Sequence, residues 1–349
     1  MINNYFKYLG SAPDPVAIKK RLGSELDKLM TLDVNLAGRA EHLYALAARG
    51  AAAPLSTGLG DKLLGAVRPA DVICLVTGCS VRPQIDVAIG EPDGPAGVAA
   101  LARALYLARH VLSVVVTAEC LLPQVAAALR TAGATLISPD RIADMRERRP
   151  NLFGAVLVGY PVDQDIDGEL ETLLNTTDPR AVIAVEHFGY AADGKAYLTA
   201  GRTVEGGLLR SAPLFAMAEE RSLLRACCVD NPNEAGTARL HSAAARHPAM
   251  ADDFEHVVVA ASANAAAYAV AAAIAGLAGT PDAAFTRELD EMVVAAVLQN
   301  GAIDPFSGLS DPALGTDTME RPYHGYVTDL MARTARGYCI AAAMVQGGT

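Results

Sequence analysis

The sequence predicts an α/β protein, with a three-layer, mostly parallel Rossmann-like sheet, helices on both faces and a helical N-terminal extension. Two observations support this fold class. After residue 72, short apolar runs rich in β-branched residues alternate with stretches of helical periodicity, which is typical of βαβ units. Before residue 67, apolar residues recur only at helical spacing. We therefore divide the chain into a helical extension, 1–66, and an α/β domain, 67–349.

Local signals place the elements. In the extension, Asp14 and Pro15 mark the start of a helix, Leu22 and Leu26 continue its apolar face, and residues 50–54 interrupt the pattern. We expect this segment to cover or extend the core. Strands are expected at 72–76, 111–116, 135–137, 155–158, 181–185, 226–229 and 256–260. Helices are expected at 97–109, 123–131, 142–148, 165–174, 212–224 and 234–246.

Residues 257–281 carry no charged side chain and are long enough in principle to span a bilayer. They are mostly alanine, which gains little free energy in lipid. Residues 257–260 instead match a buried strand, and Ser262 suits the N-cap of a helix that ends near Gly279. We expect a buried strand and a closely packed helix here, without membrane contact.

Composition excludes several function classes. A net charge of -10 and a pI near 5.2 argue against a nucleic-acid-binding surface. The six cysteines are scattered without C-x-x-C spacing, and the first ten residues lack the apolar region of a signal peptide, so we expect a reducing, cytoplasmic location. The partner we expect is a small molecule, and homo-oligomer formation stays open.

Acids and small polar residues follow four of the expected strands. Because the carboxyl ends of parallel strands meet at one edge of a sheet, these residues should surround a single crevice, where open α/β sheets bind ligands. In chain order, the candidate residues are Thr77, Gly78, Glu91, Asp93, Gly94, Glu186, His187, Asp193, Asp230, Asn233, Glu234 and Asn264.

Some of these residues also have a purely structural interpretation. Asn231-Pro232-Asn233-Glu234 fits a capping box, in which Glu234 would bind the backbone amide of the N-cap residue. Asp193 precedes a glycine, which is a common turn signal. Glu186 favours function more strongly, because a carboxylate that closes a buried strand must find a partner or a ligand.

The C-terminal part adds one binding loop and one histidine. Residues 301–319 are rich in proline, glycine and aspartate, and loops of this length in compact domains are usually lids or binding loops. His324 follows this loop and is placed for a site. The common zinc-hydrolase, serine-hydrolase, P-loop and dinucleotide signatures are absent, so no nucleotide cofactor is expected.

Taken together, the motifs resemble the D-glutamate cyclase family, in its carboxy-terminal domain, from about Asp71 to the C-terminus. The matching motifs are Thr77-Gly78, Glu91-x-Asp93-Gly94-Pro95-x-Gly97, Glu186-x-x-Gly189-x-Ala191-x-Asp193-Gly194-x-x-Tyr197, Asp230-x-x-Asn233-Glu234-x-Gly236, and Ser262-x-Asn264 with Tyr268. The resemblance implies that the α-amine of D-glutamate attacks its own γ-carboxyl group, so that water leaves and 5-oxo-D-proline forms. Such an enzyme is formally a lyase.

The resemblance also implies roles for the residues. The expected catalytic residues are Glu186, His187, Asp230 and Glu234. Glu186 would be a general base or a metal ligand, and Asp230 and Glu234 would hold a metal ion or the substrate ammonium. Hard oxygen ligands would suit Mg²⁺ or Mn²⁺. The loop 91–97 would present backbone amides to a carboxylate. The expected substrate-binding residues are Thr77, Gly78, Glu91, Asp93, Gly94, Asp193, Arg202, Asn233, Asn264 and His324, with Arg202 on the α-carboxylate.

The sequence departs from the family pattern at several positions. Asn231-Pro232 replaces a Gly-Gly pair, His187 replaces an arginine, and Leu198 and Ala200 replace an asparagine and an arginine. The loss of polar contacts favours a larger or less charged amino acid as substrate. Two alternatives stay open, namely a lactam hydrolase that runs the reaction backwards and a non-catalytic amino-acid-binding protein.

Overall fold

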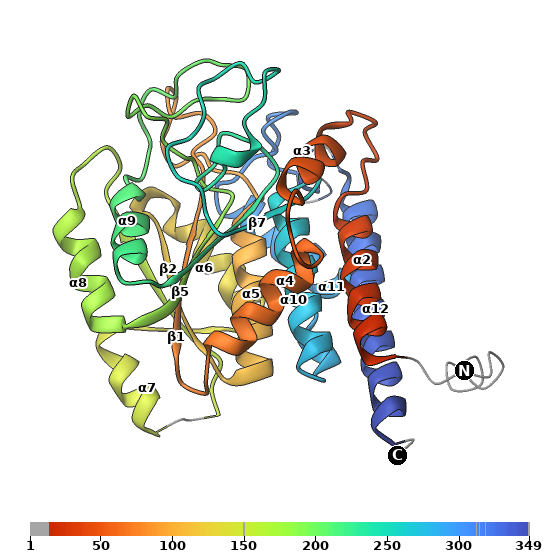
Figure 1. The fold of residues 1–349 in the computed structure, drawn as a ribbon. Helices are drawn as coiled ribbons and strands as arrows, with labels where there is room; N and C mark the ends of the chain where they lie inside the picture. Colours follow the sequence, from red (N-terminus) through yellow and green to blue (C-terminus); the bar gives the residue numbers. More distant parts are fainter. Residues whose placement is uncertain (1–13, 149–150, 312, 314, 318, 348–349) are drawn as a thin grey trace.

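The computed structural model describes residues 14–148, 151–311, 313, 315–317 and 319–347 of the 349-residue chain. Its centre is one parallel sheet of seven strands in the order β3-β4-β2-β1-β5-β6-β7 (Figure 1). The strands are β1 (Val72–Thr77), β2 (Leu112–Ala118), β3 (Thr135–Ile137), β4 (Gly154–Tyr160), β5 (Pro179–Val185), β6 (Leu224–Val229) and β7 (His256–Val259). The predicted α/β class and all seven predicted strands are confirmed.

Helices cover both faces of the sheet. Those of the extension are α2 (Pro15–Met30), α3 (Arg39–Ala47) and α4 (Leu55–Ala66). The others are α5 (Pro95–Arg109), α6 (Leu122–Thr131), α7 (Ile142–Arg148), α8 (Asp167–Thr177), α9 (Ala212–Glu220), α10 (Ala263–Leu277), α11 (Arg287–Gln299) and α12 (Arg321–Gly347). Short 3₁₀ turns lie at Glu119–Leu121, Pro139–Arg141, Ala238–Leu240 and Pro281–Ala283.

Alternate residues of each strand face two separate cores. On β1, Ile73 and Leu75 join the core that contains α2, α4, α5, α6, α10, α11 and α12. Cys74 and Val76 point the other way and join the core that contains α3, α7, α8 and α9. In Figure 1, α8 and α9 accordingly lie on the opposite side of the sheet from α5 and α10, with α2 and α12 outermost. The predicted three layers follow from this alternation.

The alanine-rich segment forms β7 and α10, as predicted. Helix α10 is buried nearly all round, and α2, α4, α5 and α12 pack against it through its small side chains. Ser262 is its N-cap and accepts a hydrogen bond from the Ala265 amide at 3.1 Å. Within the described part of the chain, no helix combines the length and apolarity needed to cross a membrane.

The prediction of a helix at 234–246 is wrong. This segment forms turns, the short 3₁₀ turn and a bridge between Thr237 and Asp253. The hydroxyl of Thr237 donates to the carbonyl oxygens of Pro232 and Glu234, and Gly236 has a φ of 84°. These local bonds compete with helical ones and redirect the chain. Helix α9 also ends four residues earlier than predicted, at Glu220, and Ser222 has a φ of 55° before β6 starts.

A buried polar triad attaches α12 to the core. His324 on α12 approaches both carboxylate oxygens of Asp290 on α11 at 3.0 Å, and the hydroxyl of Tyr268 on α10 donates to Asp290 at 2.8 Å. The other ring nitrogen of His324 lies 3.4 Å from the hydroxyl of Ser262. Burial alone would lower the pKa of His324, but the Asp290 carboxylate raises it above its ordinary value.

We predict that His324→Gln destabilises the fold in a pH-dependent way. Because the pKa of His324 is raised in the folded state, its ion pair stabilises fully below about pH 6.5 and is lost as the pH rises through the folded value. Removing one partner of a buried pair costs about 3 kcal/mol. Urea unfolding should therefore show the larger deficit at pH 6 than at pH 9. An equal deficit at both pH values would contradict the charged pair.

Candidate active site

The carboxyl ends of the central strands deliver most of the predicted site residues to one edge of the sheet. Glu186 directly follows β5, Asp230 directly follows β6, and Asn264 lies in the first turn of α10 after β7. Glu186 and the residues just after Asp230 line a cavity of about 1010 Å³. Its lining includes Arg39, Arg82, Glu91, Glu186, Arg202, Asn233 and Asp317.

Two helix N-termini cap each other beneath this cavity. Asp93, just before α5, accepts hydrogen bonds from the amides of Ala263 and Asn264 in α10, at 2.8 and 2.6 Å. In return, the side-chain oxygen of Asn264 accepts from the amides of Gly94 and Gly97, at 3.0 and 2.6 Å. Both capping side chains are buried. The amides of Gly94 and Gly97 therefore bind a protein oxygen, which corrects the expectation that they are offered to a substrate carboxylate.

The backbone places Glu186 in close contact with Gly94, at the start of α5. Glu186 has a φ of 44°, and its carbonyl oxygen accepts from the amide of Gly78 at 3.3 Å. A Cβ on Gly94, whose φ is 92°, would lie 2.9 Å from the Cβ of Glu186 and 2.5 Å from the Thr77 hydroxyl. Only glycine fits there. In the described part of the chain, the buried Thr77 hydroxyl has no hydrogen-bond partner.

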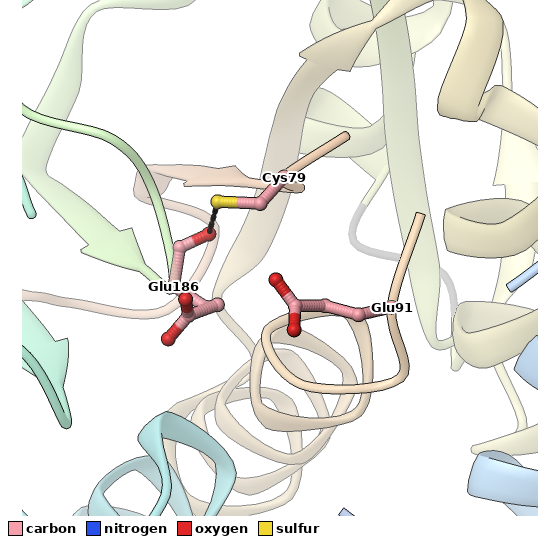
Figure 2. Close-up of side chains that lie close together, drawn as sticks. All are labelled: Cys79, Glu91 and Glu186. Atoms are coloured by element: carbon pink, nitrogen blue, oxygen red, sulfur yellow. Dashed lines mark hydrogen bonds between the residues drawn. The ribbon is translucent and has the colours of Figure 1, made fainter. Parts of the chain in front are cut away.

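Acidic side chains converge in three overlapping groups, each with ligand atoms within 4.8 Å of one another. The groups are Glu186, Asp230 and Glu234; Asp93, Asp230 and Asp317; and Cys79, Glu91 and Glu186. Figure 2 shows the third group, in which the carboxyl group of Glu91 points toward Glu186. The Cys79 thiol donates to the Glu186 carbonyl oxygen at 3.4 Å. The structure thus brings the three expected catalytic acids together.

Crowding alters the acidity of this cluster. Burial, and then mutual repulsion among the acids, holds the pKa values of Glu91, Glu186 and Glu234 well above their usual range. Burial and the Asp230 carboxylate raise the pKa of Asp93 to about 6, although the α10 amides oppose this shift. Near neutral pH the cluster therefore holds protons as well as negative charge, so an acid and a base lie side by side.

Glu234 is fixed by the backbone that carries its neighbours. One carboxylate oxygen accepts from the amides of Asp230 and Asn231, at 3.0 and 2.7 Å. This is the bond expected of a capping box, made here without a helix. The other oxygen is buried and has no protein partner among the described residues. The side chain is therefore rigid, with one oxygen free for a ligand.

Arg39 is a site residue that the sequence did not reveal. It is the first residue of α3, and its guanidinium donates to the Asp230 carboxylate and, at 2.9 Å, to the side-chain oxygen of Asn231. Asp230 is only 1% exposed, so this cation compensates a charge that water does not reach. Asp317 is the second site residue that was not among the predicted ones, and it lines the cavity. It belongs to the 301–319 loop predicted to be a lid or binding loop, and burial, followed by repulsion from Asp230 and Asp93, raises its pKa.

Several predicted residues lie elsewhere. Asp193 is exposed on a turn, where its carboxylate accepts from the Tyr197 hydroxyl at 2.6 Å. His187 is buried outside the cavity lining with Nε2 2.6 Å from the Ser211 hydroxyl, and burial lowers its pKa to about 4. His324 belongs to the α12 triad, with protein partners on both ring nitrogens. Arg202 lines the cavity, but at its exposed mouth.

Comparison with known families gives one match. The family model described as D-glutamate cyclase-like, C-terminal, matches residues 26–328. The chain belongs to this D-glutamate cyclase-like family. The match starts well before Asp71, where the resemblance was expected to begin. The C-terminal end of α2, from residue 26, and all of α3 and α4, with Arg39, therefore lie inside the family region. A search of curated proteins returned no match.

We predict that Glu91→Gln stabilises this D-glutamate cyclase-like protein. A carboxyl group with a raised folded pKa makes the fold less stable as the pH rises from about 4 through that value, and glutamine removes the effect. The melting temperature of the variant should exceed that of the wild type at pH 8, by more than at pH 5. Each unit by which folding raises the pKa corresponds to about 1.4 kcal/mol of stability lost at high pH.

The matched control is Glu205→Gln, at an exposed position on the same cavity. A variant no more stable than the wild type at pH 8 would refute the prediction.

Proposed function

We propose that this protein closes an amino diacid into a lactam with loss of water, converting D-glutamate to 5-oxo-D-proline or a related substrate to its lactam. Membership of the D-glutamate cyclase-like family supports the reaction class. The observation that carries the proposal is the cluster of buried acids around Glu186, whose pKa values are raised at one cavity. The proposed activity is a lyase in formal class, and six unpaired cysteines support a cytoplasmic setting.

The reaction needs both proton removal and proton donation. The substrate ammonium must lose a proton before its nitrogen can attack, and the γ-carboxylate must be neutralised before its carbon accepts a nucleophile. The C–N bond forms, the nitrogen gives up two protons in all, and the oxygen that leaves takes both as water. A cluster that contains ionised and protonated carboxyl groups can supply each of these transfers, and binding in a folded conformation lowers the barrier further.

In this scheme Glu186 is the base that accepts a proton from the substrate ammonium. Its second carboxylate oxygen is buried and has no partner among the described residues, so it is available to a ligand. Asp317, which lines the cavity, would bind the ammonium, with the buried Asp230 carboxylate adding negative charge nearby, and protonated Glu91 would donate to the γ-carboxyl oxygen. The Arg39 guanidinium limits the negative charge that the cluster presents, and Arg202 at the mouth would bind the α-carboxylate.

A divalent cation fits the same acids. Glu186 and Glu234 each have one buried oxygen without a protein partner in the described residues, and hard oxygen ligands suit Mg²⁺ or Mn²⁺. Cys79 is the poorer ligand, because burial and the nearby acids raise its pKa and keep the thiol protonated. When bound, such an ion would act as a Lewis acid on the γ-carboxyl group.

We predict that Glu186→Gln lowers turnover by about 100-fold or more, because positioned acid–base groups contribute factors of this size. The assay follows loss of one water by mass spectrometry from D- and L-amino diacids, with and without Mn²⁺. Glu205→Gln, at the exposed rim, should retain wild-type turnover, and the melting temperature of Glu186→Gln should not fall. Near-normal turnover by Glu186→Gln would remove this residue from the mechanism.

The same assay separates the alternatives. Gain of water by added lactam, without the forward reaction, would identify a hydrolase. Saturable binding of an amino acid without any product would identify a binding protein. Either result would overturn the proposed cyclase.

We also predict that Mn²⁺ raises the melting temperature of the metal-stripped protein by about 2 °C or more at saturating concentration, since a ligand bound only to the folded state stabilises it. Glu234→Gln should lose most of this shift, because glutamine keeps the oxygen that accepts the two amides but replaces the unpartnered one. An unchanged shift in this variant would exclude Glu234 as a ligand.

A further inference from the structure

The cavity has two ends of different chemistry. Its buried lining holds acids and Asn233, which is 6% exposed. Its exposed lining includes Leu198 and Phe306, which are 36% and 64% exposed. A cavity of about 1010 Å³ is at the upper end of the range of ~300–1,000 Å³ that encloses drug-sized ligands. A free amino diacid is far smaller and would occupy the acidic end alone.

The outer wall combines an apolar stretch, drawn from several segments of the chain, with polar side chains that include Arg82, Gln84, Arg202 and Glu205. Besides Leu198 and Phe306, the side chains of Pro83, Val204 and Pro305 line it. Single exposed apolar residues need no explanation, but a group that lines one cavity marks a surface that excludes water when a ligand binds. The wall therefore suits an apolar group that extends outward from the acidic end.

The wall is held rigidly against the acid cluster. Residues 197–203 form a tight hairpin, in which the amide of Leu198 donates to the Arg202 carbonyl oxygen at 2.8 Å. Gly201 has a φ of 85°, and a Cβ there would lie 2.3 Å from the Arg246 carbonyl oxygen. The side-chain amide of Asn233 donates to the Tyr197 carbonyl oxygen at 2.8 Å. The part of the wall that carries Leu198 is thus held in a fixed position beside the acid cluster.

Asn233 also marks the junction between the two ends. Its side-chain oxygen is buried and has no partner in the described part of the chain, although the residue lines the cavity. An unpartnered buried acceptor calls for a donor from the ligand. The α-carboxylate of a free amino acid has only acceptors, whereas a peptide bond at the same place supplies an N–H group.

We infer that the substrate is a glutamyl peptide, in which the α-carboxyl group of an N-terminal glutamate is joined through an amide to an apolar residue. This inference rests on the proposed cyclase activity and names the substrate class of the same site. The free α-amine attacks the γ-carboxyl carbon, the C–N bond forms, one C–O bond breaks and water leaves. The product is a 5-oxoprolyl peptide, whose apolar residue stays against the apolar stretch of the outer wall. In such a peptide, the C-terminal carboxylate takes the place of the α-carboxylate as the partner of Arg202.

The test compares glutamyl-leucine, glutamyl-aspartate and free glutamate, in both D and L forms at glutamate, as substrates of the full chain. Loss of one water is followed by mass spectrometry, and binding is measured in parallel by calorimetry. Apolar pocket contacts change kcat/KM by about 10-fold to 200-fold. Glutamyl-leucine should therefore exceed both other compounds by about 10-fold or more.

Two variants test whether Leu198 causes the preference for glutamyl-leucine over glutamyl-aspartate. Leu198→Asp should lower the ratio of kcat/KM for glutamyl-leucine over glutamyl-aspartate by about 10-fold. Leu309→Asp is the matched control, since Leu309 is 55% exposed but does not line the cavity, and it should keep the wild-type ratio. Melting temperatures check that both variants fold.

The outcomes distinguish the inference from the proposed function. Conversion of free glutamate at least as efficient as that of glutamyl-leucine would overturn the inference and leave the cyclase intact. If no compound loses water, the proposed cyclase fails, and the calorimetric dissociation constants then decide the ligand class. In that case, binding of free glutamate as tight as that of glutamyl-leucine would overturn the inference as well.

Discussion

The reciprocal capping of α5 and α10 is the interaction on which the candidate site depends. Asp93 binds the first amides of α10 while Asn264 binds those of α5, and all of these groups are buried. A buried carboxylate is costly unless hydrogen-bonded, and the positive end of a helix dipole is a favourable place for one. The exchange fixes the start of α5 against the start of α10, and it thereby holds Gly94, at the N-cap of α5, close to Glu186. It also occupies backbone amides at both helix N-termini that could otherwise hold an anion.

The acid cluster works against the stability of the fold that contains it. Burial and mutual repulsion raise the pKa values of several carboxyl groups, and Glu186 adopts a left-handed backbone conformation that non-glycine residues rarely take. Such conflicts between local preference and overall structure are common at functional sites. Here the conflict is tolerated because two apolar cores enclose the sheet, and the alanine-rich α10 lets four other helices pack closely on one side.

Much of this arrangement could be predicted from the sequence, for identifiable reasons. Runs such as 72–76 and 181–185 are apolar on both faces and therefore match buried parallel strands, and parallel strands place their carboxyl ends together. The helix at 234–246 could not be excluded, because the pattern from Asn231 to Glu234 makes the same carboxylate-to-amide bonds whether or not a helix follows. Arg39 gave no signal at all. Its contact with Asp230 joins positions 191 residues apart, and no motif surrounds Arg39 in the sequence. Asp193 and His324 matched the pattern of a site, but turn formation and helix attachment fully occupy their side chains.

The ion pair between Arg39 and Asp230 bears on how this protein can be divided. In the sequence, the helical extension 1–66 can be separated from the α/β domain that carries the acids. In the structure, Arg39 of the extension balances the negative charge of Asp230 in the domain. A shortened chain that began at residue 67 would retain every carboxyl group of the cluster and lose its guanidinium counterion. A fragment for expression, recombination or domain grafting should therefore start upstream of α3. The boundary at residue 67, which the secondary structure suggests, would separate Asp230 from its counterion.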